Sequence, residues 1–188
     1  RAGVINEKEA LLRVEPNKLD ELLHPVFDLS ALAAAKSIAR GLPASPGAAT
    51  GQVVFHADEA EEWAAKGKKV VLVRIETSPE DLKGMNVAEG ILTARGGMTS
   101  HAAVVARGMG KCCVSGAGSL KINYKERTLN IDDVAIREGD WISLNGSTGD
   151  VYLGKIATRE PELSGDFGSL MELADKHARM YVRTNADT

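Results

Sequence analysis

From residue 41 onward, short apolar runs alternate with glycines and polar turns, a pattern typical of β-strands. Helical patterning separates the earlier runs at residues 58–66, 79–83 and 100–107, whereas hairpin-type turns separate the runs after Gly116. The sequence therefore predicts an α/β domain with parallel and antiparallel strands over residues 41–157. The expected strands are Gln52–Phe55, Lys69–Arg74, Gly90–Thr93, Cys112–Ser115, Thr128–Ile131, Trp141–Leu144 and Asp150–Leu153.

Residues 1–40 have a different pattern, in which leucines and alanines recur at helical spacing. Asn6 followed by Glu9 resembles a capping box, so we expect a helix there that Pro16 ends. Two further helices are expected, one over residues 17–24 and one over Leu29–Ala39. Short helices in series suit a helical linker that packs on a neighbouring domain.

The pattern of residues 158–188 predicts a second linker. Asp166 can cap a helix that runs to about Arg179, and Met180–Thr184 has the pattern of a strand. Because a strand needs partners, we expect its sheet to lie in a following domain. Since the chain also lacks an initiating Met, we interpret it as a piece of a longer protein.

Composition narrows the class of protein. The 188 residues are 44% hydrophobic and 4% aromatic, with a net charge of −3, which argues against a nucleic-acid-binding protein. Cys112 and Cys113 are adjacent, so they suit buried positions in a reducing compartment better than a disulfide framework or a zinc site. No apolar run approaches the roughly 20 residues that span a bilayer. We expect a cytoplasmic protein without membrane contact, and an organelle remains an alternative.

The segment Gly96-Gly97-Met98-Thr99-Ser100-His101 holds the strongest chemical signal. It places His101 at the start of a small-residue helix, where unpaired amides and the helix dipole stabilise an anion. Thr99 or Ser100 can serve as the N-cap. A neutral imidazole there has a lone pair that can attack phosphorus. The alternative is a structural histidine that bonds a backbone carbonyl.

Other residues can support such a nucleophile. Thr77 can donate a hydrogen bond to the imidazole or its phosphoryl group, or it can cap the helix that begins at Pro79. Arg95 and Arg107 can neutralise phosphoryl oxygens or be solvated surface charges. No metal is expected here, because His24, His56 and His177 are dispersed and show no ligand spacing.

The run GGMTSHAAVVARGMGKCCVSG, residues 96–116, resembles the phosphohistidine signature of the phosphoenolpyruvate (PEP)-utilising enzymes. Its details are similar to the pyruvate, phosphate dikinase family, whereas PEP synthases typically have a cysteine before the histidine. Residues 41–47, 76–81 and 144–149 resemble further landmarks of the same domain. Together these matches cover most of residues 41–157.

The resemblance implies a swivelling β/β/α phosphohistidine domain with His101 as the catalytic residue, supported by Thr77, Gly96, Gly97, Ser100 and Arg107. In that family the domain carries a pyrophosphoryl and then a phosphoryl group between ATP and pyruvate, which would require hinges near Gly41 and Glu160. By the same resemblance, Thr99 matches a regulatory phosphorylation site.

The resemblance also implies partners. These are a nucleotide-binding domain that precedes the helical linker of residues 1–40 and a PEP/pyruvate-binding barrel that follows residues 158–188, which would form a linker helix and the first strand of the barrel. These domains would hold Mg²⁺, in a homodimeric parent. Two alternatives stay open at this point. One is the phosphohistidine domain of a PEP synthase or related phosphotransferase, and the other is a non-catalytic docking module.

Overall fold

The computed structural model describes residues 4–16, 19, 22–161 and 165–180. These residues belong to two compact units, one formed by residues 24–161 and one that joins described parts of residues 1–23 and 162–188. The helix expected over residues 17–24 and the strand expected over Met180–Thr184 lie largely outside the described residues.

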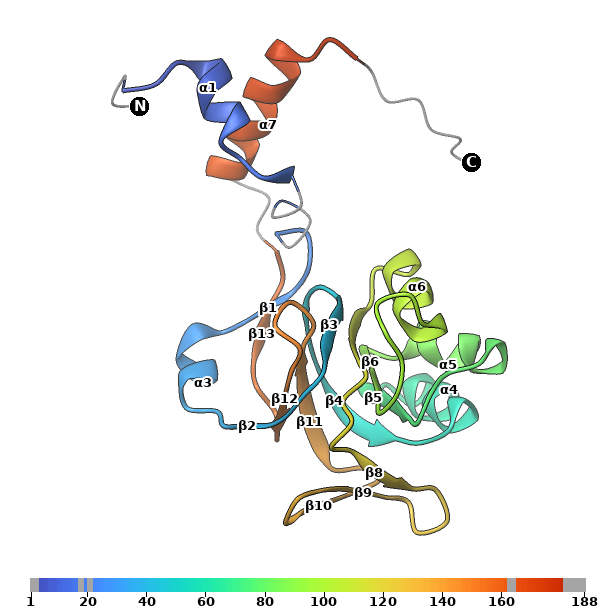
Figure 1. Cartoon of the computed structure of the whole chain (residues 1–188). Helices are drawn as coiled ribbons and strands as arrows, with labels where there is room; N and C mark the ends of the chain where they lie inside the picture. Colours follow the sequence, from blue (N-terminus) through green and yellow to red (C-terminus); the bar gives the residue numbers. More distant parts are fainter. Residues whose placement is uncertain (1–3, 17–18, 20–21, 162–164, 181–188) are drawn as a thin grey trace. The chain divides into compact units, whose positions relative to one another are not determined.

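An eight-stranded mixed sheet organises the larger unit, in the order β2-β12-β11-β4-β5-β6-β7-β3 (Figure 1). Its centre, β4 to β7, is parallel, and antiparallel strands flank it on both sides. The expected mixture of parallel and antiparallel strands is therefore confirmed. The strands are β2 (Ser37–Arg40), β3 (Leu42–Ser45), β4 (Ala48–Val54), β5 (Val70–Arg74), β6 (Gly90–Thr93), β7 (Cys112–Ser115), β11 (Trp141–Asn145) and β12 (Asp150–Leu153).

Strand β5 shows how the sequence builds a core on each face of this sheet. Val70 to Val73 are all fully buried. Because successive side chains point to opposite faces, Val71 and Val73 join one hydrophobic cluster while Val70 and Leu72 join another. A continuous apolar run is what a parallel strand covered on both faces requires.

Three helices cover one face of the parallel strands: α4 (Ala57–Ala65), α5 (Leu82–Val87) and α6 (His101–Gly108) (Figure 1). Apart from Met85 of α5, their buried residues are small, among them Ala60, Ala103 and Ala106, so the helices approach the sheet closely. Gly84 in α5 lies so near α4 that an added Cβ would stand 2.5 Å from Ala57 Cα. Small residues therefore set the spacing on this face.

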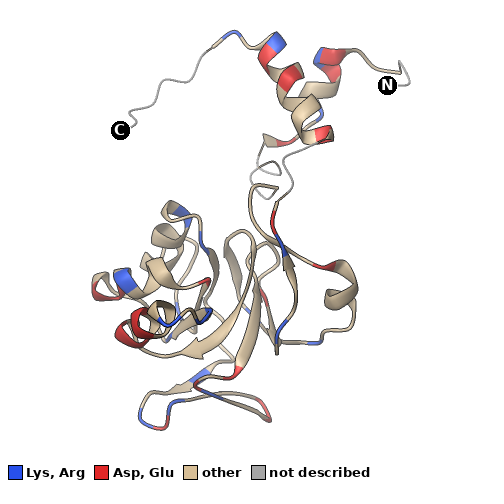
Figure 2. Ribbon diagram, turned by 180° about the vertical axis from the view of Figure 1, so that it is seen from behind, with Lys and Arg blue, Asp and Glu red and all other residues tan. Residues whose placement is uncertain are grey.

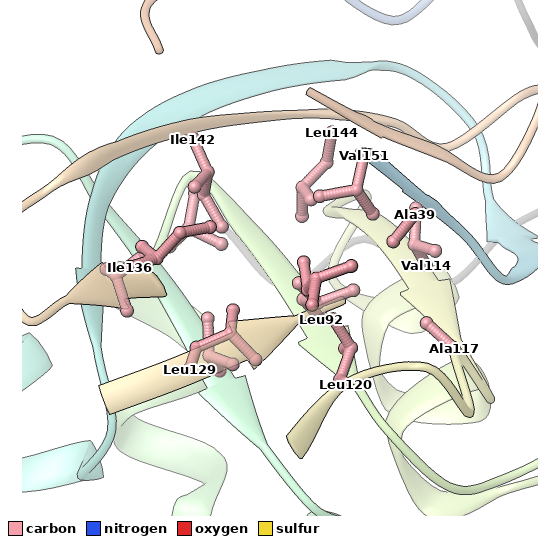
Figure 3. Close-up of a cluster of buried hydrophobic side chains, with 14 of the residues drawn as sticks. Ala39, Leu92, Val114, Ala117, Leu120, Leu129, Ile136, Ile142, Leu144 and Val151 are labelled. Atoms are coloured by element: carbon pink, nitrogen blue, oxygen red, sulfur yellow. The ribbon is translucent and has the colours of Figure 1, made fainter. Parts of the chain in front are cut away.

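The other face packs on a three-stranded antiparallel sheet made of β8 (Lys121–Asn123), β9 (Thr128–Ile131) and β10 (Val134–Arg137). Leu129 and Ile136 from this small sheet meet Ile142 and Leu92 of the large one (Figure 3). Fully burying a side chain of this size contributes about 2 kcal/mol. The pair β1 (Val26–Phe27) and β13 (Thr158–Arg159) completes the unit.

One predicted helix is shorter than expected. The helix expected over Leu29–Ala39 ends at Ala33 as α3, and Ser37–Arg40 forms β2, which pairs with β12. The alanines favour a helix locally, but the pairing with β12 decides the conformation. As a result the compact unit begins at residue 24 and includes residues 24–40, which the sequence assigned to a helical linker.

The smaller unit pairs helices α1 (Glu7–Leu12) and α7 (Asp166–His177). Asn6 caps α1 by accepting a hydrogen bond from the Glu9 amide, as expected. Glu7 accepts hydrogen bonds from Lys176 Nζ and lies 2.9 Å from His177 Nε2, and these contacts hold the pKa of Glu7 below its ordinary value. Charges from the two ends of the sequence thus meet in this unit.

Basic and acidic residues are interspersed over the helices and turns of both units (Figure 2). Among the described helices, none combines the length and apolar character needed to cross a bilayer.

Candidate functional site

His101 is the first residue of α6, directly after the loop that leaves β6. Ser100 is the N-cap, with extended backbone angles and a side chain that accepts a hydrogen bond from the Ala103 amide at 3.4 Å. His101 itself is half-buried, between the apolar underside of α6 and solvent. The prediction that His101 stands at a capped helix start is confirmed.

The loop before His101 depends on Gly96. Its φ of +117° is one that other residues rarely adopt, and an added Cβ would lie 2.9 Å from Ser100 Oγ. Gly116 packs closely against the same loop. An added Cβ at Gly116 would stand 2.4 Å from the Gly96 carbonyl oxygen. An added Cβ at Gly97 would meet no described atom within 4 Å. Gly96 is therefore required by the loop conformation, whereas crowding does not explain Gly97.

Thr77 lies against His101. Its hydroxyl oxygen is 3.0 Å from Nδ1 of the imidazole, and the Thr77 residue is 8% exposed. The alternative role, capping of the helix at Pro79, belongs to Ser78, which is the N-cap of the 3₁₀ helix η1 (Pro79–Asp81). The Thr77 hydroxyl is thereby left for the imidazole.

Arg107 binds backbone carbonyl oxygens. Its Nε donates to the Ala44 carbonyl oxygen at 2.8 Å, and Nη2 donates to the carbonyl oxygen of Met98. The guanidinium thus ties α6 to the end of β3 and to the loop before His101. Arg95 and Thr99 are exposed, so Thr99 is accessible to a modifying enzyme.

The charge around the helix start suits an anion. Within α6, which is described throughout, the first turn holds no acidic residue, while Arg107 stands in the last turn. The amides of the first turn therefore face no side-chain carboxylate of their own helix. A phosphoryl group on His101 would lie beside these amides, where the helix dipole favours negative charge.

Three residues that the sequence did not single out complete the surroundings of Thr77. Asp81 accepts a hydrogen bond from the Ser78 amide at 2.9 Å. Arg74 Nε lies 3.4 Å from Asp81 Oδ2, and the Tyr124 hydroxyl accepts from the Ile75 amide at 2.8 Å. The spacing Ser78-x-x-Asp81 is a capping-box pattern that could have revealed Asp81. Nothing local in the sequence pairs Tyr124 with Ile75.

The cysteines are structural, as expected. Both are buried on β7, and Cys112 Sγ donates to the Gly47 carbonyl oxygen at 3.2 Å. Burial raises the pKa of Cys113 to about 12 and that of Cys112 further still. A thiol with so high a pKa is not a nucleophile at neutral pH.

The donors around His101 do not fit a magnesium site. Mg²⁺ prefers carboxylate oxygens, and the nearby groups are the hydroxyls of Thr77 and Ser100 and the imidazole itself. The carboxylate of Asp81 is engaged by Ser78 and Arg74. Among the described residues, no group of three or more His, Cys, Asp or Glu residues could hold a metal ion.

Comparison with known proteins gives a consistent result. Residues 66–149 match the family model of the PEP-utilising enzyme, mobile domain. Pyruvate, phosphate dikinase 2 of Oryza sativa subsp. japonica is 57% identical over 186 residues, and pyruvate, phosphate dikinase of Clostridium symbiosum is 58% identical over 186 residues. Each alignment covers 99% of this chain and 21% of the relative, so the chain spans about a fifth of their length.

The chloroplastic pyruvate, phosphate dikinase of Mesembryanthemum crystallinum is 56% identical over the whole chain. Among solved structures, an Enzyme I structure determined by NMR aligns with 57% of this chain and 36% of its own, at 22% identity and a TM-score of 0.33. That likeness is too weak to support a conclusion.

Proposed function

We propose that this chain, whose residues 66–149 match the mobile domain of the PEP-utilising enzymes, is the phosphoryl-carrier part of a pyruvate, phosphate dikinase with His101 as the carrier. The observation that carries this proposal is the contact of Thr77 with His101 Nδ1 at a capped helix start. That contact leaves Nε2 as the nitrogen that can react. Alignment with dikinases over 99% of the chain favours this reaction over that of a PEP synthase.

In the first step, the Nε2 lone pair of His101 attacks the β-phosphorus of ATP. The bond between this phosphorus and the AMP oxygen breaks, and AMP leaves with the electron pair. Thr77 Oγ1 lies 3.0 Å from Nδ1. This step requires the tautomer with the proton on Nδ1, in which Thr77 Oγ1 accepts that proton and shares the positive charge that forms on the ring. The amides at the start of α6 stabilise the phosphoryl oxygens.

In the next steps, inorganic phosphate removes the terminal phosphoryl group as pyrophosphate, and His101 keeps the remaining one. The enolate oxygen of pyruvate then attacks this phosphorus, the P–Nε2 bond breaks, and PEP forms. The two transfers replace one direct transfer that is harder. The domains outside this chain would hold magnesium, which would supply neutralisation of phosphate charge.

The partners follow from this assignment. A nucleotide-binding domain and a pyruvate-binding barrel of the same polypeptide would present their substrates to His101 in turn, with a hinge near Glu160 and a homodimeric parent. The hinge expected near Gly41 does not fit, because Gly41 joins β2 and β3 of one sheet. The division into residues 1–40, 41–157 and 158–188 is part of this proposal, except that residues 24–40 fold with the carrier unit and not with the linker. We place the protein in the cytoplasm or in an organelle, as in its chloroplastic relatives.

Regulation by phosphorylation of Thr99 is also part of the proposal. Thr99 is exposed and two residues from His101. A phosphate there would add about two negative charges beside a site that must accept another phosphoryl group. Inhibition would therefore be electrostatic.

The test uses a chimera in which this chain replaces the matching segment of the Clostridium symbiosum relative, incubated with ATP labelled at the β-phosphate. We expect acid-labile, alkali-stable label on the protein and none on the His101→Ala variant. His56→Ala is the matched control, because His56 also stands at a helix start, and it should retain the label. Label on the His101→Ala chimera would overturn the assignment, and an unlabelled parent chimera would favour a docking module.

A further inference from the structure

The contact between Thr77 and His101 depends on the turn that carries Thr77. The residue after it, Ser78, has its amide bound to Asp81 Oδ2 at 2.9 Å and its hydroxyl 3.4 Å from the same oxygen. Asp81 is 5% exposed. A buried carboxylate therefore fixes the backbone on one side of Thr77.

Arg74 holds Asp81 in place. At the end of β5, its Nε lies 3.4 Å from Asp81 Oδ2, and its Nη1 donates to the Phe55 carbonyl oxygen at 3.0 Å. The guanidinium also lies over the ring of Tyr124, at 5.1 Å from the centroid. Because burying one charge without the other is costly, the two residues act as a pair.

The other side of Thr77 is fixed as well. The Tyr124 hydroxyl accepts a hydrogen bond from the Ile75 amide at 2.8 Å. Tyr124 directly follows β8, so the three-stranded sheet reaches the turn after β5. The amides of Ile75 and Ser78, on the two sides of Thr77, are thus bound by the side chains of Tyr124 and Asp81, which lie far apart in the sequence.

We propose that Asp81, held by Arg74, is a positioning residue that decides which nitrogen of His101 is reactive. It orients Thr77 so that Thr77 Oγ1 accepts the Nδ1 proton, and the lone pair then resides on Nε2. Asp81 does not touch the imidazole; it acts through Ser78 and Thr77. This inference rests on the proposed function, because a tautomer matters only if a ring nitrogen reacts.

The test measures the tautomer of His101 in the 188-residue chain itself, by long-range ¹H–¹⁵N NMR at about pH 9, where an ordinary imidazole is neutral. The wild-type chain should hold mainly the Nδ1–H form. Thr77→Val should lower the ratio of the Nδ1–H to the Nε2–H form about fivefold, the factor that corresponds to one net hydrogen bond. Thr77→Ser should restore it.

Asp81→Ala should lower the same ratio about as much as Thr77→Val, because the turn is no longer held. If Asp81→Ala does not fold, Asp81→Asn decides, since it keeps an oxygen for the Ser78 amide but loses the charge that faces Arg74. We expect Asp81→Asn to lower the ratio about twofold, a part of one net hydrogen bond. An unchanged ratio in the folded Asp81 variant would overturn the inference.

Asp28→Ala is the matched control. Asp28 also caps a helix, α3 (Leu29–Ala33), through the amides of Ser30 and Ala31, and it also pairs with an arginine, Arg159. It should lose stability without a change in the His101 tautomer. A tautomer change in this variant equal to that of Asp81→Ala would show a general effect of destabilisation and would overturn the inference.

A second measurement concerns the product. Phosphoramidate transfers its phosphoryl group to an imidazole with loss of ammonia, so it tests the chain without ATP or another domain. ³¹P NMR should show phosphate on Nε2 in the wild-type chain and an increased share on Nδ1, about fivefold, in Asp81→Ala. An unlabelled chimera together with these results would refute the proposed function but not the control of the tautomer by Asp81.

Discussion

Two histidines of this chain stand at comparable places, and only one has the surroundings of a phosphoryl carrier. His56 is the N-cap of α4, after the parallel strand β4, and His101 is the first residue of α6, after the parallel strand β6. Both are half-buried. Position at the carboxyl edge of a parallel sheet therefore does not distinguish them, and the neighbouring side chains must.

The first turn of α4 contains Asp58 and Glu59, whereas the first turn of α6, all of it described, has no acidic residue. Carboxylates at the start of α4 already complement its dipole and would repel a phosphoryl group. The ring of His56 packs against the ring of Tyr124, at 5.5 Å between centroids, whereas Nδ1 of His101 meets a hydroxyl. A phosphoryl-carrying histidine thus needs to lie at the start of a helix whose first turn contains no acidic residue.

The largest effect is expected from placing an acid in the first turn of α6. Val104 is 54% exposed, so Val104→Glu can be accommodated without disturbing the core. One added charge at this range is worth about 1 kcal/mol in water, so phosphorylation of His101 by phosphoramidate should slow about fivefold, as followed by ³¹P NMR. Val104→Gln is the neutral control. Equal rates for the two variants would mean that the charge of the first turn does not select the carrier.

A smaller effect is expected from the caps. Ser100→Ala removes the hydrogen bond to the Ala103 amide and should lower the free energy of unfolding by about 1 kcal/mol. His56→Ala should cost less, since in the described structure the His56 side chain makes no cap hydrogen bond and loses its ring contact with Tyr124. Urea denaturation of both variants measures the difference, and a larger loss for His56→Ala would contradict it.

The smallest effect concerns pH. Burial and the neighbouring Glu138 raise the pKa of Glu59 above its ordinary 4.5, while Arg127 opposes the shift. The folded chain therefore binds this proton more tightly than the unfolded chain, and stability should fall as pH rises from 4.5 through the raised pKa.

Glu59→Gln should remove that part of the pH dependence and change the free energy of unfolding by about 0.5 kcal/mol. Denaturation of Glu59→Gln over a pH series, compared with the same series for Glu61→Gln, measures this change in the free energy of unfolding. If the free energy of unfolding of Glu59→Gln keeps the same slope against pH, the pKa of Glu59 is not raised in the folded chain.

Strong local patterns made part of this structure predictable. Strands Gly90–Thr93, Cys112–Ser115 and Thr128–Ile131 have the predicted bounds, because apolar runs between glycines and turns leave few alternatives. The capped start of α6 and the place of His101 also follow from local sequence, since cap and dipole act within one turn.

What could not be predicted depends on distant partners. Strand β2 forms because β12, more than 100 residues later, pairs with it. Arg107 has a charge suited to phosphate, yet backbone carbonyl oxygens that the fold brings near it accept its hydrogen bonds. Tyr124 reaches Ile75 across 49 residues. Contacts between residues so far apart produce no periodic pattern in the sequence.

The pairing of α1 with α7 has a consequence for the order in which the chain folds. Glu7 and Lys176 are separated by 169 positions, and β1 pairs with β13 inside that interval, so the contacts are nested. During synthesis α1 emerges first but must wait for α7, while the sheet between them can assemble. Once β1 and β13 have met, the loop that α1 and α7 still have to close is far shorter, which lowers its entropic cost.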